Sequence, residues 1–128
     1  MQQRVDVTGG AILYLDDEEP LVFLVTRLLE RLGYAPSGFT DVTAALTAFR
    51  SNPERYALVL TDLSMPGASG LDFAREVLAI APGTRVAILT GNVHPTDVTR
   101  ATAMGIRAVV QKPLTVDELG PVVRQLLG

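Results

Sequence analysis

Residues 11–18 read AILYLDDE, five apolar side chains followed by three acidic ones. An apolar run of this length without alternation is typical of a strand that is buried on both faces of a sheet. The next segment carries apolar side chains at helical spacing and stops before Gly33, a residue suited to the position after a helix. This apolar stripe consists of Leu21, Leu24, Val25, Leu28 and Leu32. The sequence therefore predicts a buried strand followed by an amphipathic helix.

Four further segments repeat this unit along the chain. The five predicted strands are Ala11–Leu15, Tyr34–Phe39, Tyr56–Thr61, Arg85–Thr90 and Ile106–Gln111. Four of them are nearly continuous apolar runs, and we expect these four to be buried on both faces. The second strand contains Pro36, and a proline cannot donate a hydrogen bond to a neighbouring strand. We therefore place this strand at an edge of the sheet.

The predicted helices begin and end at recognisable residues. Thr40 and Ser69 are the expected N-caps of the second and third helices, and the fourth helix is expected from Thr96 to Met104. Five strand–helix units in succession imply a parallel sheet with right-handed crossovers and helices on both faces.

The last predicted helix contains a local conflict. Thr115 and Glu118 match the capping-box pattern at its start, and an apolar stripe follows. The dipeptide Gly120-Pro121 lies inside this pattern, where a proline removes one hydrogen bond and destabilises a helix by roughly 3 kcal/mol. We expect a kink or a delayed helix start at this place.

Polar side chains stand at the ends of four predicted strands. Asp16 and Asp17 follow the first strand, and Asp62 follows the third. Thr90 ends the fourth strand, and Lys112 follows the fifth. Ligands of open α/β sheets bind outside the carboxyl ends of the strands. We therefore expect three carboxylates, one hydroxyl and one ammonium group to meet at one edge of the sheet.

These groups together suit phosphoryl chemistry. Three neighbouring carboxylates repel one another unless a proton or a cation lies between them, and oxygen ligands are what Mg²⁺ prefers. An ammonium and a hydroxyl group suit phosphoryl oxygens, and a carboxylate that attacks phosphorus forms an acyl phosphate. The site therefore predicts Mg²⁺-assisted transfer of a phosphoryl group onto an aspartate.

Four segments that contain these residues resemble the signature stretches of bacterial response-regulator receiver domains. They are Ile12–Glu18 (ILYLDDE), Thr61–Gly67 (TDLSMPG), Leu89–Gly91 (LTG) and Gln111–Pro113 (QKP). The resemblance implies a single receiver domain at residues 11–128, preceded by a linker or tail at residues 1–10. It also implies an α/β fold with one doubly wound, five-stranded parallel sheet of flavodoxin-like order 2-1-3-4-5 and helices on both faces.

The resemblance implies a function for the acidic residues. Asp62 is expected to accept a phosphoryl group from a phosphohistidine of a sensor histidine kinase or a histidine phosphotransfer protein, as in a two-component phosphorelay. Asp17 is expected to bind Mg²⁺ directly and Asp16 mainly through water. Asp62 and the backbone carbonyl of Ser64 are expected to complete the metal site.

The remaining signature residues are expected to contact the phosphoryl group. Thr90 would donate a hydrogen bond to it, Lys112 would pair with its charge, and Gly91 would leave room for it. The bond between Lys112 and Pro113 is expected to be cis, as is usual in the family.

Val109 departs from the family pattern, which often has Tyr or Phe three residues before the lysine. Valine or leucine there is more typical of receivers in hybrid sensor kinases, and the segment Thr8-Gly9-Gly10 resembles the joint that precedes such receivers. We therefore expect the receiver of a hybrid sensor kinase, with a stand-alone single-domain response regulator as the alternative. No output domain is expected in this chain.

Two other functions are open to an aspartate site on such a sheet. Phosphatases with an aspartate nucleophile need a second aspartate two residues after the first, and this chain has Ser64 there. A binding module that has lost phosphorylation should lack at least one of Asp16, Asp17, Asp62 and Lys112, and all four are present. We therefore expect a signalling module, not an enzyme that turns over an external substrate.

Composition excludes several other classes. The formal net charge of the 128 residues is −3, without a basic cluster, so we expect no direct contact with nucleic acid. Cysteine is absent, which excludes disulfides and thiolate sites. No apolar run is long enough for a membrane span, and residues 1–10 do not resemble a secretory signal. We expect a cytoplasmic protein.

Overall fold

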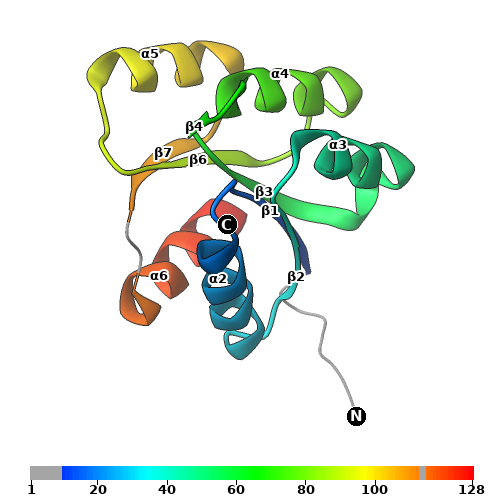
Figure 1. Ribbon diagram of the computed structural model, residues 1–128, viewed down its shortest axis with the longest axis vertical. Helices are drawn as coiled ribbons and strands as arrows, with labels where there is room; N and C mark the ends of the chain where they lie inside the picture. Colours follow the sequence, from blue (N-terminus) through cyan, green and yellow to red (C-terminus); the bar gives the residue numbers. More distant parts are fainter. Residues whose placement is uncertain (1–9, 113–114) are drawn as a thin grey trace.

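The computed structural model describes residues 10–112 and 115–128 (Figure 1). Five parallel strands form its main sheet in the spatial order β2-β1-β3-β6-β7, which confirms the predicted topology. The strands are β1 (Ala11–Leu15), β2 (Ala35–Phe39), β3 (Tyr56–Asp62), β6 (Val86–Thr90) and β7 (Ala108–Gln111). Their bounds agree with the prediction within two residues, and the proline-containing β2 lies at an edge as expected.

Helices cover both faces of the sheet, as Figure 1 shows. On one face, α2 (Glu19–Arg31) and α6 (Val116–Leu127) pack on a cluster that includes Ile12 and Leu60. On the other, α3 (Val42–Ser51), α4 (Gly70–Ile80) and α5 (Pro95–Met104) pack on a cluster that includes Leu13 and Ile88. Residues that alternate along β1 therefore serve opposite cores, which explains its continuous apolar run.

One burial prediction is wrong for β7. This strand was expected to be buried on both faces, yet Ala108 to Val110 are half-buried and Gln111 is exposed. The reason is its position, since among the described strands β7 pairs with β6 alone and lies at the second edge of the sheet. An edge strand has one neighbour fewer to shield its side chains.

The stripe predicted for α2 contains one wrong member. Leu24 is 46% exposed, whereas Val25, Leu28 and Leu29 are buried. Successive helical residues are separated by about 100°, so Leu24 lies at the margin of the buried face, which Val25, Leu28 and Leu29 form. Full burial of a leucine such as Leu29 contributes about 1.5–3 kcal/mol, and the half-exposed Leu24 has only part of this contribution.

The helix caps confirm three predictions and correct a fourth. Ser69 accepts a hydrogen bond from the backbone N–H of Leu71, and Thr115 and Glu118 form a complete capping box. Gly105 ends α5 in the left-handed conformation at φ 90°. The cap of α3 is Asp41, not Thr40; the Asp41 carboxylate accepts from Ala44 N at 2.9 Å.

Of the two outcomes expected for α6, a kink or a delayed start, the delayed start is wrong. The helix begins at Val116, and Pro121 lies inside it. The capping box fixes the start at Thr115, while Pro121 is exposed, so water can reach the carbonyl that loses its partner.

Three short elements were not predicted. A 3-10 turn, η1 (Pro53–Arg55), precedes β3, and a small antiparallel hairpin of β4 (Ser64–Met65) and β5 (Ala68–Ser69) follows it. The hairpin turn contains Gly67 at φ 70°, which agrees with the turn chemistry of Pro66-Gly67. The hairpin returns the chain to the end of β3, so α4 begins beside Asp62.

Candidate functional site

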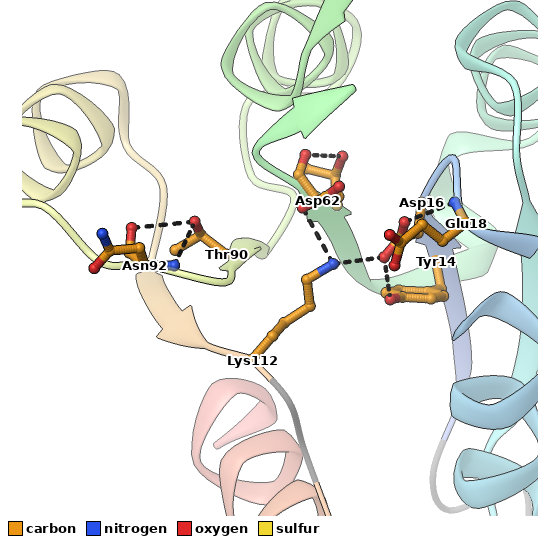
Figure 2. Close-up of polar contacts among 8 residues, drawn as sticks. Tyr14, Asp16, Glu18, Asp62, Thr90, Asn92 and Lys112 are labelled. Carbon is orange, nitrogen blue, oxygen red and sulfur yellow. Dashed lines mark hydrogen bonds and ion pairs between the residues drawn. The ribbon is translucent and has the colours of Figure 1, made fainter. Parts of the chain in front are cut away.

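The predicted polar side chains lie at the carboxyl ends of four neighbouring strands. Asp16 follows β1, Asp62 ends β3, Thr90 ends β6 and Lys112 follows β7. Figure 2 shows the Lys112 side chain extending between Asp16 and Asp62. The parallel sheet thus brings together groups that are up to 96 residues apart in sequence.

Lys112 bridges two carboxylates. Its Nζ lies 2.8 Å from Asp16 Oδ2 and 3.2 Å from Asp62 Oδ1. The lysine side chain is only 15% exposed, so water screens both interactions weakly. Burial alone lowers the pKa of the ammonium, but the hydrogen bond and charge of Asp16, together with Asp62, outweigh it and raise the pKa. Lys112 is therefore a cation in this site.

Asp16 is fully buried and has donors on both of its oxygens. Its Oδ1 accepts from Glu18 N at 2.9 Å, and its Oδ2 accepts from Lys112 Nζ and from the Tyr14 hydroxyl, each at 2.8 Å. Burial, followed by the neighbouring charge of Asp16, raises the pKa of Tyr14, which stays a neutral donor. The Asp16 carboxylate is thus held in one orientation by three donors.

Asp62 lies at the end of a buried strand and is 8% exposed. Burial raises the pKa of its carboxyl, and the nearby charge of Lys112 opposes this effect. Its backbone is held closely: the Thr61 hydroxyl donates to Asp62 O at 3.0 Å, and a Cβ placed on Gly70 would lie 2.0 Å from the same oxygen. Only glycine fits at position 70 without movement of the strand end.

Asp17 is exposed and completes an acidic group. Asp16, Asp17 and Asp62 each offer a carboxylate oxygen, and these oxygens lie within 4.8 Å of one another. All-oxygen donors with one exposed member suit a divalent cation that keeps part of its water shell, so these residues fit Mg²⁺. The exposed position of Asp17 gives a cation access from solvent.

Ser64 and Thr90 line the same open cavity as Asp17, Asp62 and Lys112. The Thr90 hydroxyl lies 3.3 Å from both the backbone N and O of Asn92. Within the part of the chain that the structure describes, it makes no hydrogen bond to Asp62. Thr90 is therefore at the site but paired with its own loop.

Sequence reasoning missed Tyr14 and Gly70. Tyr14 carries a polar group in a buried strand, two residues before Asp16 and on the same face, and this spacing was a usable signal. The close approach of Gly70 to Asp62 depends on the hairpin, which the sequence did not predict.

Val109 is half-buried against the core on the α4 face. Pro113, and with it the expected cis bond, lies outside the described residues, as do Thr8 and Gly9.

Among the described residues, no helix has the length and apolar character needed to cross a membrane.

The family description "Response regulator receiver domain" matches residues 12–124. The DNA-binding response regulator MtrA of Mycobacterium tuberculosis is 34% identical over 123 residues, which cover 96% of this chain and 53% of that protein. The sensory/regulatory protein RpfC of Xanthomonas campestris pv. campestris is 30% identical over 93% of this chain and 17% of its own length.

Solved structures agree with these matches. A response regulator receiver domain protein from Clostridium thermocellum has a TM-score of 0.85 and 30% identity, covering 92% of this chain and 94% of that one. The response regulator TrrA of Thermotoga maritima, solved in complex with Mg²⁺-BeF, has a TM-score of 0.80 and 31% identity over 92% and 99% of the two chains. This chain spans about half the length of the MtrA proteins that it matches. The match over residues 12–124, the parallel sheet and the carboxylate–lysine site together place the chain in the response regulator receiver domain family.

Proposed function

We propose that this chain is a phosphoacceptor receiver that takes a phosphoryl group onto Asp62 from a phosphohistidine of a sensor histidine kinase or a histidine phosphotransfer protein. The proposal rests mainly on the ammonium of Lys112, which lies within 3.2 Å of two carboxylates beside a third. Asp16 holds the Lys112 ammonium beside Asp62, and a cation in this place suits the negative charge of an incoming phosphoryl group.

In the proposed step, one carboxylate oxygen of Asp62 attacks phosphorus and forms an acyl phosphate. The bond between phosphorus and the donor's imidazole nitrogen breaks, and that nitrogen keeps the electron pair. Lys112 then pairs with the phosphoryl oxygens, and Thr90 turns its hydroxyl from Asn92 toward them. Gly91 has no side chain to block this approach, and no described residue lies within 4 Å of a Cβ built on it.

Asp17 and Asp62, with Asp16 through water and the Ser64 carbonyl, would hold Mg²⁺. When bound, Mg²⁺ supplies charge neutralisation for the phosphoryl oxygens and brings the carboxylates together. The Mg²⁺-BeF complex of TrrA supports this assignment, because that receiver is 31% identical to this chain.

The chain would act as a switch and not as a turnover enzyme, since the only phosphoryl group it handles is its own. Ser64 stands where an aspartate-nucleophile phosphatase needs an acidic residue.

We keep the receiver of a hybrid sensor kinase as the preferred parent, because Val109 lacks the aromatic ring of many stand-alone regulators. A kinase domain encoded directly upstream would support this origin, and a native start codon at Met1 would exclude it. Two expectations stay predictions: the chain does not itself bind DNA, and it is cytoplasmic.

The test is incorporation of phosphate from acetyl phosphate in the presence of Mg²⁺. We expect one acid-stable, base-labile phosphoryl group per wild-type chain and none on Asp62→Asn. Asp72→Asn is the matched control, because Asp72 is an exposed aspartate on α4 that does not line the cavity of the site. Equal labelling of Asp62→Asn and wild type would refute the function.

A further inference from the structure

Tyr14 is a buried polar side chain with no part in the phosphotransfer described above. It lies in β1, is fully buried, and belongs to the apolar cluster that α2 and α6 cover. Its hydroxyl and the ammonium of Lys112 both lie 2.8 Å from Asp16 Oδ2 (Figure 2). Two donors therefore converge on one oxygen of a fully buried carboxylate.

Lys112 has competing partners in this arrangement. In the unphosphorylated protein its ammonium is shared between Asp16 Oδ2 and Asp62 Oδ1. A phosphoryl group on Asp62 adds negative charge on that side, so Nζ is drawn toward it and away from Asp16. A buried carboxylate oxygen that loses its donor is unfavourable, so Asp16 would resist this movement.

The Tyr14 hydroxyl is a second donor to the same oxygen of Asp16. Its ring is fixed by the surrounding core, so its hydroxyl stays at Asp16 Oδ2 when the ammonium leaves. The third donor, Glu18 N, cannot replace it, because it binds the other oxygen of the carboxylate. We propose that Tyr14 is a positioning residue that keeps Asp16 hydrogen-bonded while Lys112 shifts to the phosphoryl group. The inference rests on the proposed function of Asp62.

The first experiment removes the hydroxyl alone. Tyr14→Phe keeps the ring, and Tyr56→Phe is the matched control, because Tyr56 is a buried tyrosine on the other side of the sheet whose hydroxyl bonds to none of the described residues. Phosphorylation by acetyl phosphate at saturating Mg²⁺ is resolved into a maximal rate and a half-saturating donor concentration. We expect Tyr14→Phe to lower the maximal rate about two- to tenfold, which is the effect of one net hydrogen bond. The half-saturating concentration of acetyl phosphate should stay unchanged. Tyr56→Phe should leave both unchanged.

The second experiment follows Lys112 directly. It is the only lysine in the chain, so protein labelled with lysine that carries ¹³C at Cε alone gives a single side-chain signal. Phosphorylation should move this signal in the wild type. The movement should be smaller in Tyr14→Phe, where Asp16 retains the ammonium. A purely structural effect of the hydroxyl would alter stability without changing this response.

The outcomes separate the two proposals. If the wild type takes up no phosphate, the function of Asp62 is refuted. If it does, and Tyr14→Phe has the wild-type rate, or slows no more than Tyr56→Phe, only the inference about Tyr14 is refuted. If Tyr14→Phe fails to fold, hydrogen exchange of the wild type tests the inference instead. The Tyr14 hydroxyl proton should remain protected from exchange with water after phosphorylation. Fast exchange of this proton would refute the inference.

Discussion

Lys112 Nζ and Asp16 Oδ2 lie 2.8 Å apart, with the lysine side chain 15% exposed and the aspartate fully buried. A pair with so little access to water behaves differently from a surface ion pair, because solvent compensates less for the loss of either partner. The same ammonium contacts Asp62, so one side chain links the buried carboxylate to the proposed phosphoacceptor.

Removal of this cation should destabilise the fold. Lys112→Met leaves Asp16 and Asp62 without their shared partner, and we expect a loss of about 1–3 kcal/mol in the free energy of unfolding, measured by urea denaturation without Mg²⁺. Arg50→Gln is the control, because it breaks an ion pair with Glu76 whose side chains are 57% and 53% exposed. That change should lower stability by less than about 1 kcal/mol. Similar losses for both variants would contradict the prediction.

Neutralisation of Asp62 should stabilise the protein in a pH-dependent way. Burial raises the pKa of this carboxyl above its ordinary value of 3.8, so the folded state binds the proton more tightly than the unfolded chain. Ionisation of Asp62 therefore lowers stability as pH rises above that value. We expect Asp62→Asn to gain about 0.5–2 kcal/mol at pH 7, with a smaller gain near pH 4. A gain that is independent of pH between 4 and 7 would contradict this cause.

Gly70 should be needed for the position of Asp62. In Gly70→Ala the new Cβ would lie 2.0 Å from the Asp62 carbonyl oxygen, so the strand end or α4 has to move. We expect a loss of about 1–3 kcal/mol and slower phosphorylation. The control is Gly83→Ala, where none of the residues that the structure describes lies within 4 Å of the added atom. This variant should be neutral or stabilising by about 0.4–1 kcal/mol. Thermal denaturation and the acetyl phosphate assay distinguish the two.

Mg²⁺ should stabilise the folded protein through the three aspartates. At a concentration one hundred times its dissociation constant, a ligand that binds only the folded state adds about 2.7 kcal/mol. Thermal unfolding with and without MgCl₂ measures this effect. Asp17→Asn should reduce the shift because it removes an exposed ligand, whereas Asp72→Asn should keep it. An unchanged shift in Asp17→Asn would exclude Asp17 as a ligand.

The cap of α3 can be tested directly. Asp41→Ala removes the acceptor for Ala44 N and should lower stability by about 0.5–2 kcal/mol. Thr40→Ala should have little effect, since the Thr40 side chain is exposed and does not cap the helix. Urea denaturation of the two variants compares the residue expected from sequence with the residue found in the structure.

Local sequence predicted the elements well where the apolar pattern was strong. The strand Ala11–Leu15 and the capping box at Thr115 were both confirmed, because each depends on neighbours within a few residues. The prediction of Thr40 as the cap failed because threonine and the aspartate that follows it are both good cap residues, and the pattern alone does not fix the first helical residue. The half-burial of β7 depends on which strands are neighbours, and that is a property of the whole sheet.

The sequence by itself determined which residue types stand at the carboxyl ends of the strands: Asp16, Asp17, Asp62, Thr90 and Lys112. This followed from parallel topology, because all strands then end at one edge. Only the tertiary structure decided the partners of these groups. Lys112 is shared between Asp16 and Asp62, Tyr14 binds the same oxygen as Lys112, and Gly70 touches the backbone of Asp62. Such contacts join residues from different elements over a few ångströms, and they are fixed by side-chain packing, which no local pattern encodes.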